Sequence, residues 1–309
     1  MKIVNIEDIS ALDSSSIVTV GMFDGVHQGH RHLIAKLLSL AAERTLRPVV
    51  VTFDRHPRLV MDAQAPLSLL STYEERMSLL EGCGVDTVAL VRFTRETAAL
   101  SACSFARQYL CHHLRMRTLL LGYDNMFGSR QHDDFEQLPQ LAEACGFDIC
   151  RDDAVLMDGV EVSSTKVRRA LQQGDLRRAN AMLGAPYSLS GRVVHGRHVG
   201  TGLGFPTANI QPEDSHKMLP GAGVYALRAS VGGRDYVAMA NLGDQPTFHS
   251  EHPVLEVHLL DFDGDLYGSE VRVTFLEKLR DIRQFESPEA LRQQLERDRA
   301  DVARMATGG

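Results

Sequence analysis

The pattern of hydrophobic and polar positions changes near residue 185. Before it, short apolar runs rich in β-branched residues alternate with stretches whose apolar residues recur at helical spacing. Strands that alternate with helices favour a parallel sheet covered on both faces, with ligands beyond the carboxyl ends of the strands. We predict strands over 16–23, 47–53, 86–93, 117–123 and 146–151, and helices over 29–44, 72–83, 101–114 and 134–145.

After residue 185, glycines become frequent and strand patterns follow one another without helices between them. This succession indicates an antiparallel barrel or sandwich, and hence a second domain. A last helix is expected over 287–305, with Ser287 as its N-cap and Pro288 at its first position. The strands are predicted over 191–196, 223–231, 234–243, 254–262 and 270–279. We place an α/β domain at 1–185 and a β domain at 186–309.

Composition excludes several classes of protein. The net charge of −7 argues against a general nucleic-acid binder, which needs a basic surface. The apolar runs are too short to span a bilayer, and we expect no membrane partner. The five cysteines are odd in number and form no C-x-x-C pair, so we expect reduced thiols in a cytoplasmic protein.

A first motif, "GMFDGVHQGH" at 21–30, lies where a predicted strand becomes a helix. Gly21 permits close approach of a ligand to the backbone. A helix that begins near Gly29 presents free N–H groups and a positive dipole end, which suit a phosphate. His27 and His30 can face one anion because they are three residues apart. We predict a polyphosphate site in which imidazoles supply hydrogen-bond donors and positive charge.

Two other interpretations of this motif stay open. His27, His30 and His32 could bind zinc, although zinc sites usually need a carboxylate or thiolate at ligand spacing, and Asp24 is the nearest candidate. The histidines could also do no more than cap the helix.

A second motif, "EVSSTKVRR" at 161–169, is a hydroxyl-rich turn that opens a helix. Ser163, Ser164 or Thr165 can cap this helix, and Arg168 lies about one turn further on. Hydroxyls, a helix N-terminus and an arginine together make a second anion site. An ordinary capped surface helix is the alternative.

A third motif, "GRVVHGRHVGTGLGFPTANI" at 191–210, is dense in glycine, and such a loop can wrap a nucleotide through its N–H groups. Thr207 and Asn209 alternate along an extended segment and offer hard oxygen ligands for a magnesium ion that touches phosphates. Glu256 lies in an apolar strand pattern, where a carboxylate can act as a general base or lie half-exposed on an edge strand. His195 and His258 are interpreted as structural.

These motifs carry a resemblance to known enzymes. The first two resemble the G-x-F-D-G-x-H-x-G-H and I-S-S-T-x-x-R elements of nucleotidyltransferases. The stretches 49–57 and 121–130 resemble two elements of flavin adenylyltransferases. The segments "GFPTAN", "ANLGDQPTF" and "EVHLLDF" resemble riboflavin kinase. In this order they resemble the bifunctional prokaryotic FAD synthetase family, which nearly all of the chain matches.

The resemblance implies a Rossmann-like nucleotidyltransferase domain followed by an antiparallel β-barrel riboflavin kinase domain with a C-terminal helix. It implies phosphorylation of riboflavin by ATP to FMN, then adenylylation of FMN by ATP to FAD and pyrophosphate, with Mg²⁺ as cofactor. The implied catalytic residues are His27, His30, Arg168 and Glu256, and the metal ligands are Thr207 and Asn209. The implied ATP-binding residues are Gly21, Phe23, Asp24, Gly29, Ser164, Thr165, Gly200, Gly204, Pro206, Thr207 and Asn209. The implied flavin-binding residues are Phe53, His56, Pro57, Asp124, Phe127, Arg280, Arg283 and Phe285.

The sequence departs from the family pattern at a few positions. Asn125 and Met126 stand where the family has Phe and Arg, and Thr201 replaces an arginine of the glycine loop. Two rival functions therefore stay open. One is a riboflavin kinase without adenylyl transfer, and the other is a flavin- or nucleotide-binding regulator without turnover.

Overall fold

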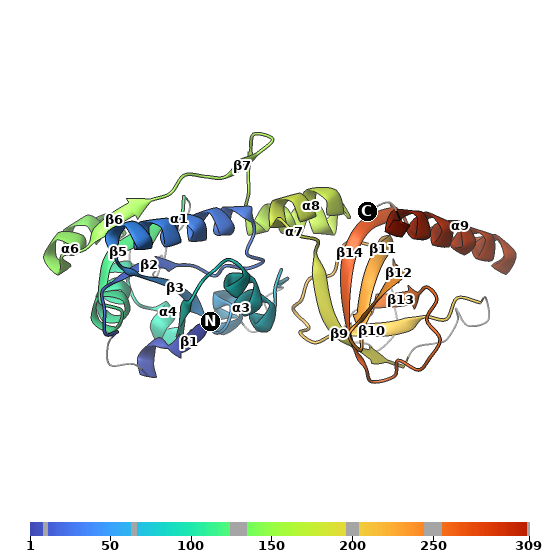
Figure 1. Ribbon diagram of the computed structural model, residues 1–309, viewed down its shortest axis with the longest axis horizontal. Helices are drawn as coiled ribbons and strands as arrows, with labels where there is room; N and C mark the ends of the chain where they lie inside the picture. The colour runs from blue at the N-terminus through green and yellow to red at the C-terminus, as the bar shows by residue number, and fades with distance from the viewer. Residues whose placement is uncertain (9–11, 63–66, 124–134, 196–203, 244–254, 308–309) are drawn as a thin grey trace. The chain divides into compact units, whose positions relative to one another are not determined.

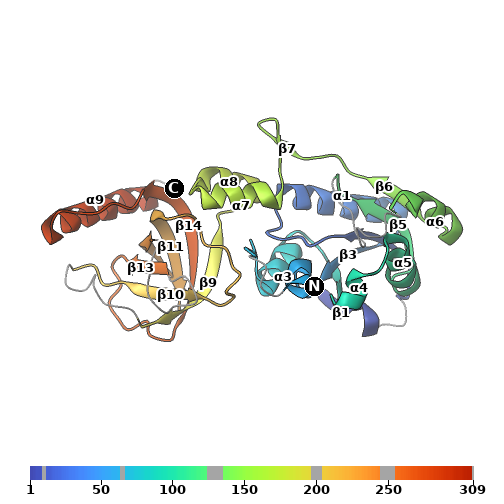
Figure 2. The same cartoon turned by 180° about the vertical axis from the view of Figure 1, so that it is seen from behind.

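The computed structural model describes residues 1–8, 12–62, 67–123, 135–195, 204–243 and 255–307. It consists of two compact units, Met1–Ser163 and Ser164–Gly309, and each is described by itself (Figures 1 and 2). No helix in these described ranges is long and apolar enough to cross a membrane. The following positions that the sequence analysis singled out lie outside the described residues: Asp124, Asn125, Met126, Phe127, Gly200 and Thr201.

The first unit is an α/β domain, as the alternating pattern predicted. Its helical elements include two 3-10 turns, η1 and η3, and one π-helix, η2. The elements are β1 (Lys2–Asn5), η1 (Ile6–Asp8), β2 (Ser16–Val20), α1 (Gln28–Arg44), β3 (Arg47–Phe53), α2 (Pro57–Met61), α3 (Tyr73–Gly82), β4 (Thr87–Val91), α4 (Arg95–Ala98), α5 (Ala102–Phe105), η2 (Ala106–His113), β5 (Met116–Leu121), η3 (Phe135–Gln137), α6 (Leu138–Cys145), β6 (Asp148–Arg151), β7 (Leu156–Met157) and β8 (Val160–Glu161).

The main sheet of this unit has the order β1-β4-β3-β2-β5-β6, and every pair of neighbours is parallel. From β2 the chain moves outward through β3 to β4 on one side, and β5 and β6 continue on the other side. The order therefore reverses between β2 and β5, and ligands of such sheets bind beyond the strand ends at that reversal. The H-x-G-H motif directly follows β2, so the topology puts it at this point.

Both faces of the sheet are covered, because successive strand side chains enter different cores. Val50 packs with Leu37 of α1 and Leu80 of α3. Its neighbour Val51 packs in a second core that contains Leu110 of η2. The predicted parallel sheet with two covered faces is confirmed.

Three local features differ from the sequence prediction. The expected helix over 101–114 is α5 followed by the π-helix η2. The edge strand β1, which pairs with β4, was not predicted. The hairpin β7–β8 turns through Asp158 and Gly159, both at positive φ (51° and 73°). Strands this short leave too few residues for an alternating pattern to be recognised.

The second unit begins with a helical pair and continues as a closed β-barrel that a last helix covers. Around the barrel the strands follow the order β10-β13-β12-β11-β14-β9, with every paired neighbour antiparallel. The predicted antiparallel barrel with a C-terminal helix is therefore confirmed. The elements are α7 (Ser164–Gln172), α8 (Leu176–Leu183), β9 (Ser188–Val194), β10 (Ala208–Pro212), β11 (Gly223–Val231), β12 (Arg234–Leu242), β13 (Leu255–Leu259), β14 (Glu270–Arg280) and α9 (Pro288–Thr307).

Backbone and side-chain contacts join the helical pair to the barrel. The Gly221 N–H donates to the Leu171 carbonyl at 2.8 Å. The Asn180 side chain donates to the Phe275 carbonyl and accepts from the Tyr187 N–H. These contacts place α7 and α8 in the same unit as the barrel, so this unit begins at Ser164. The boundary predicted from the change of pattern near residue 185 lies after both helices.

Gly191 was counted in the glycine-rich motif and also placed at the start of a predicted strand, and the structure agrees with the strand, because Gly191 lies inside β9. A Cβ at this position would approach the Gln211 carbonyl oxygen of β10 to 2.4 Å. Only glycine allows the two strands to come this close. At the other end of the unit, the Ala290 N–H donates to the Ser287 hydroxyl at 3.2 Å, which confirms Ser287 as the N-cap of α9.

Candidate functional site

The loop after β2 has an unusual backbone. Phe23 and Val26 have φ values of 52° and 39°, and Gly25 has 78°. Positive φ is uncommon for residues with a side chain and costly for a β-branched one, so such residues persist only where packing holds them. Both Phe23 and Val26 are completely buried among α1 and the sheet. The loop is therefore held rigidly in the conformation that leads into α1.

His27 is the N-cap of α1, so capping is one role of the motif. Its Nδ1 accepts the backbone N–H of His30 at 3.4 Å. The two imidazoles are stacked, with ring centroids 3.6 Å apart and planes 17° from parallel. The described residues contain no group of three or more His, Cys, Asp or Glu side chains arranged to hold a metal.

The environment of His30 keeps its imidazole uncharged in the ligand-free protein. Burial lowers its pKa well below the usual value, and the neighbouring His27 lowers it further. The His30 Nδ1 is buried and has no hydrogen-bond partner within the described residues. The positive charge expected on this imidazole is thus absent at neutral pH, and the neutral ring offers hydrogen bonding instead.

Gly29, between the two histidines, leaves room that a side chain would fill. A Cβ at Gly29 would lie 3.2 Å from two atoms of the His27 ring and 3.5 Å from the Val162 carbonyl oxygen. Similarly, a Cβ at Gly21 would lie 3.1 Å from the Phe23 ring. Each glycine therefore makes room for a neighbouring ring, and the spacing H-x-G-H follows from the stacked histidines.

Asp24, predicted to bind ATP, braces the loop from within. Its carboxylate is buried and accepts the N–H groups of Leu70 and Ser71 at 3.0 Å each. The Ser71 hydroxyl also donates to it, and accepts the N–H of Gly25 at 2.9 Å. These bonds tie the loop after β2 to the segment before α3. A direct contact of Asp24 with ATP stays a prediction.

Three of the five flavin residues predicted in this unit lie at the end of β3 or just after it. The Phe53 ring packs edge-on against Phe93 at 5.2 Å and is partly buried against the core. His56 caps α2 by accepting the Arg58 N–H at 3.2 Å, and Pro57 occupies the first helical position. His56 and Pro57 thus form the start of α2, and all three residues lie at or just beyond the carboxyl end of β3.

The second anion motif opens α7, the first helix of the second unit. The helix begins at Ser164, which puts Ser163 at the N-cap position and Arg168 one turn into the helix. Ser164 and Arg168 are half-buried, and Thr165 is exposed.

The candidate kinase site lies on three neighbouring strands of the barrel. Glu256 of β13 pairs directly with Asn209 of β10 and with Asn241 of β12. Directly opposed side chains on adjacent strands lie on the same face of a sheet. The Asn241 amide donates to the Glu256 carboxylate at 3.5 Å. The register therefore brings the predicted base and one predicted metal ligand together, with a second amide beside them.

Two cavities lie beside this row and share its Asn209 end. The first, of about 350 Å³, lies between Pro206 and the 262–267 loop, and we name it the loop-side cavity. The second, of about 320 Å³, extends from Glu256 towards α9, and we name it the helix-side cavity. Thr207 and Asn209 line both cavities. A group bound in one can therefore reach a group bound in the other at these two side chains.

The backbone that carries Thr207 is held by a histidine. The His258 ring lies 2.8 Å from the Pro206 carbonyl oxygen through Nδ1 and packs edge-on against Phe205. This contact agrees with the structural interpretation of His258. Gly204, just before Phe205, has φ of 80° in an exposed turn.

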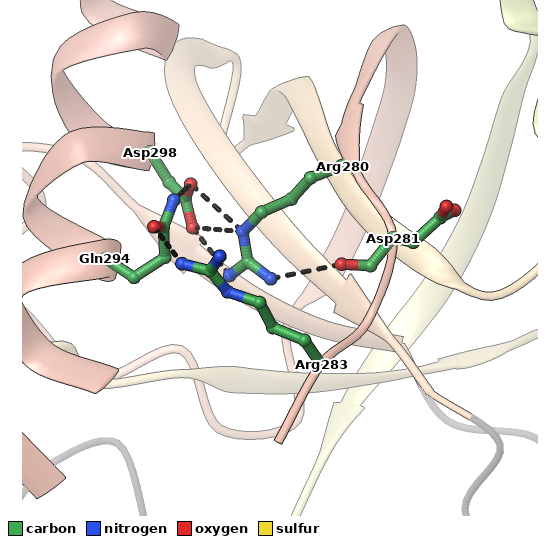
Figure 3. A network of polar contacts seen from close by, with 5 residues as sticks. All are labelled: Arg280, Asp281, Arg283, Gln294 and Asp298. Carbon is green, nitrogen blue, oxygen red and sulfur yellow. Dashed lines mark hydrogen bonds and ion pairs between the residues drawn. The ribbon is translucent and has the colours of Figure 1, made fainter. Parts of the chain in front are cut away.

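The helix-side cavity is bounded by the three flavin residues predicted in this unit, Arg280, Arg283 and Phe285. Figure 3 shows how α9 holds the two arginines. Arg280 donates to both carboxylate oxygens of Asp298, the shortest of these contacts being 2.7 Å, and Arg283 donates to Gln294. Both guanidinium groups also lie over the Phe285 ring, at 5.7 and 4.9 Å from its centroid.

Sequence reasoning missed Asn241, Gln294 and Asp298. The segment "ANLGDQPTF", which contains Asn241, was recognised as a motif, so its position carried a signal. Gln294 and Asp298 carried none, because polar residues of a helix look like solvent-facing ones until the packing is known.

Comparison with known proteins agrees with both units. The FAD synthetase family model matches residues 9–166, and the riboflavin kinase family model matches residues 183–306. The bifunctional riboflavin kinase/FMN adenylyltransferase of Escherichia coli K12 is 38% identical over 91% of this chain and 90% of its own length. The enzyme of the same name from Bacillus subtilis is 32% identical over 94% of this chain and 92% of its own length.

A solved structure described as a macrolide-efflux protein from Streptococcus pneumoniae matches with a TM-score of 0.87 and 31% identity, and the match covers 98% of each chain. Its name differs from those of the curated relatives, but the fold is shared. The two family models, in this order on one chain, and the high-coverage relatives show that the chain belongs to the bifunctional riboflavin kinase/FMN adenylyltransferase family.

Proposed function

We propose that this chain makes FAD in two ATP-dependent steps, one in each unit. The first step phosphorylates riboflavin to FMN, and the second joins FMN to the AMP part of ATP. The observation that carries the proposal is the row Asn209–Glu256–Asn241 beside two cavities, on the same chain as the stacked histidines after β2. Each feature supplies what one of the two reactions requires.

In the kinase step, riboflavin occupies the helix-side cavity and ATP the loop-side cavity. Glu256 takes the proton of the riboflavin 5′-hydroxyl, whose oxygen forms a bond to the γ-phosphorus while the bond to ADP breaks. Asn241 orients the Glu256 carboxylate through its amide hydrogen bond.

A magnesium ion fits between the two cavities. The Thr207 hydroxyl and the Asn209 carboxamide are hard oxygen donors, and both line the space that the phosphates would share. When bound, the ion neutralises charge on the transferring phosphate. Thr207 and Asn209 are therefore proposed as its protein ligands, and their own part is to fix where the γ-phosphate lies against Glu256.

In the adenylyl step, a phosphate oxygen of FMN attacks the α-phosphorus of ATP, and pyrophosphate leaves. This oxygen is ionised at neutral pH, so the step needs positioning and charge stabilisation and no strong base. His27 and His30 hydrogen-bond the triphosphate. Approach of the polyanion favours protonation of His30, and the positive charge then forms in the complex. Ser164, Thr165 and Arg168 keep the phosphate-binding roles that the family resemblance predicts.

We place both reactions in the cytoplasm. None of the five cysteines, all of which lie in the described residues, forms a disulfide bond, which fits a compartment that keeps thiols reduced.

A time course with purified protein tests the proposed function. Riboflavin, ATP and Mg²⁺ are incubated with the protein, and the flavins are separated by HPLC. FMN that appears first and then converts to FAD supports both steps. FMN alone identifies a riboflavin kinase without adenylyl transfer, and neither product from folded protein identifies a binding protein.

A further inference from the structure

We propose that Arg76 is a positioning residue for adenylyl transfer, which sets the separation between the nucleotide loop 21–27 and the flavin segment 53–57. The inference depends on the proposed function of the first unit. It concerns a residue of α3 that belongs to none of the recognised motifs.

The Arg76 side chain spans two strand ends. One terminal nitrogen donates to the Met22 carbonyl at 3.1 Å, and the other donates to the Phe53 carbonyl at 2.6 Å. Met22 lies in the loop after β2, and Phe53 is the last residue of β3. A guanidinium group is planar and its two terminal nitrogens have a fixed spacing, so one side chain holds both carbonyls at a set separation.

The position of Arg76 is costly for the fold. The residue is only 3% exposed, and its Nε is buried without a partner within the described residues. Burial lowers the pKa of its guanidinium, while the nearby Asp24 charge acts in the opposite direction. A buried arginine stays charged, and an apolar side chain would avoid this desolvation. Its hydrogen bonds to the loop 21–27 and to the segment 53–57 explain why a charged side chain is buried at this position.

Residues near Arg76 also hold the loop 21–27 in place. Ser71, just before α3, accepts the Gly25 N–H and donates to Asp24. The Thr52 hydroxyl of β3 reaches the Met22 carbonyl at 3.4 Å. The start of α3 is itself fixed by a capping box between Thr72 and Glu75. A rigid support therefore lies behind both segments, and Arg76 alone among these residues bonds to both.

The reaction makes this separation important. ATP bound at the loop and FMN bound at the flavin segment must meet at the α-phosphorus, and a displacement of about 1 Å can cost about a hundredfold in rate. Each substrate still binds to its own segment if the separation changes. Loss of the two Arg76 hydrogen bonds should thus lower kcat for adenylyl transfer and leave KM for ATP and for FMN nearly unchanged.

The test compares Arg76→Met and Arg76→Lys with the wild-type chain. We expect Arg76→Met to lower kcat for FAD formation from FMN and ATP by about tenfold to a hundredfold, with KM for ATP and FMN within about threefold. Riboflavin phosphorylation by the same preparation should be unchanged, because it takes place in the other unit. Arg76→Lys should recover little of the rate, since a single ammonium group cannot replace the planar fork.

Hydrogen exchange separates positioning from stability. Amides of 21–27 and 53–57 should exchange faster in Arg76→Met, while those within β2 and β3 keep their protection. Arg44→Met is the matched control, because Arg44 also bonds across strands of this unit, to Thr118 and Asp148, away from both segments. The proposal is overturned if kcat stays within twofold of the wild type, or if it falls together with the protection of the strands. A wild-type chain that makes no FAD refutes the proposed function instead.

Discussion

Asp298 on α9 holds Arg280 at the end of β14 by a two-oxygen ion pair inside the second unit. The carboxylate is 3% exposed and the guanidinium 18%. The pair fixes an arginine that lines the helix-side cavity, and the Asp298 carboxylate offsets the positive charge that this arginine would otherwise present to an anion. A wall of this kind suits an uncharged aromatic ring, which agrees with the proposed binding of riboflavin.

Asp298→Ala should destabilise the second unit and weaken its use of riboflavin. Removal of one partner leaves a partly buried charge uncompensated, and we expect the free energy of unfolding to fall by about 3–5 kcal/mol. KM for riboflavin should rise because Arg280 loses its fixed position. Urea unfolding and kinase kinetics measure the two effects. Asp301→Ala on the same helix removes the exposed pair with Arg304 and should cost about 1 kcal/mol or less; equal losses for both variants would contradict the prediction.

Gly29→Ala should impair adenylyl transfer without harming the kinase. The new methyl group would press on the His27 ring from 3.2 Å and displace it from its stack with His30. We expect FAD formation from FMN to slow by about tenfold to a hundredfold. Gly82→Ala, at the end of α3 where a Cβ meets nothing within 4 Å, is the control and should behave as the wild type. Undisturbed activity of Gly29→Ala would show that the stack is not needed.

His30 should make the first unit less stable in mild acid. Its pKa is lowered in the folded protein, so below about pH 6.5 the unfolded chain binds a proton that the folded chain does not. The free energy of unfolding therefore falls as pH drops from about 6.5 towards the folded pKa, by at most about 1.4 kcal/mol per pH unit. Urea midpoints at pH 7.5, 6.5 and 5.5 should fall more steeply for the wild type than for His30→Asn. Parallel curves would mean that His30 is already charged.

The same shift predicts proton uptake when ATP binds. The triphosphate raises the pKa of His30 again, so the protein should take up protons from the buffer at pH 6.0. Calorimetric titrations with ATP in buffers of different ionisation enthalpy measure this uptake. His30→Asn should take up fewer protons than the wild type. Equal uptake by both proteins would assign the protons to another group.

Glu256→Gln should abolish riboflavin phosphorylation selectively. The amide keeps the shape of the side chain but cannot accept the hydroxyl proton, and we expect kcat to fall by about 10²- to 10⁴-fold. FAD formation from supplied FMN should persist, and His30→Ala should give the reverse pattern. Glu277→Gln, an exposed position on β14 of the same barrel, serves as control. If one variant removed both activities from folded protein, the two reactions would share a site.

Local patterns were sufficient to predict most of the fold. The alternation of apolar runs with helical spacing predicted β2 to β6 and their parallel sheet, and the closely spaced strands with glycines predicted the barrel. The Ser287 cap and the H-x-G-H turn followed from backbone needs of a few neighbouring residues. Such features are readable because periodicity and capping involve residues close together in the chain.

Other features depended on contacts between residues far apart in the sequence. The pairing of Glu256 with Asn209 and Asn241 comes from the register of three barrel strands. Gly191 was predicted to begin a strand and was also counted in the glycine-rich motif, but only the structure shows that the close approach of β10 requires a glycine there.

Arg76 and Asp298 looked like polar residues of amphipathic helices, and only packing buries them against their partners. A chain's local pattern records which face of a helix is apolar. It does not record which distant carbonyl or carboxylate a buried side chain will meet, because that depends on how the whole unit folds around it.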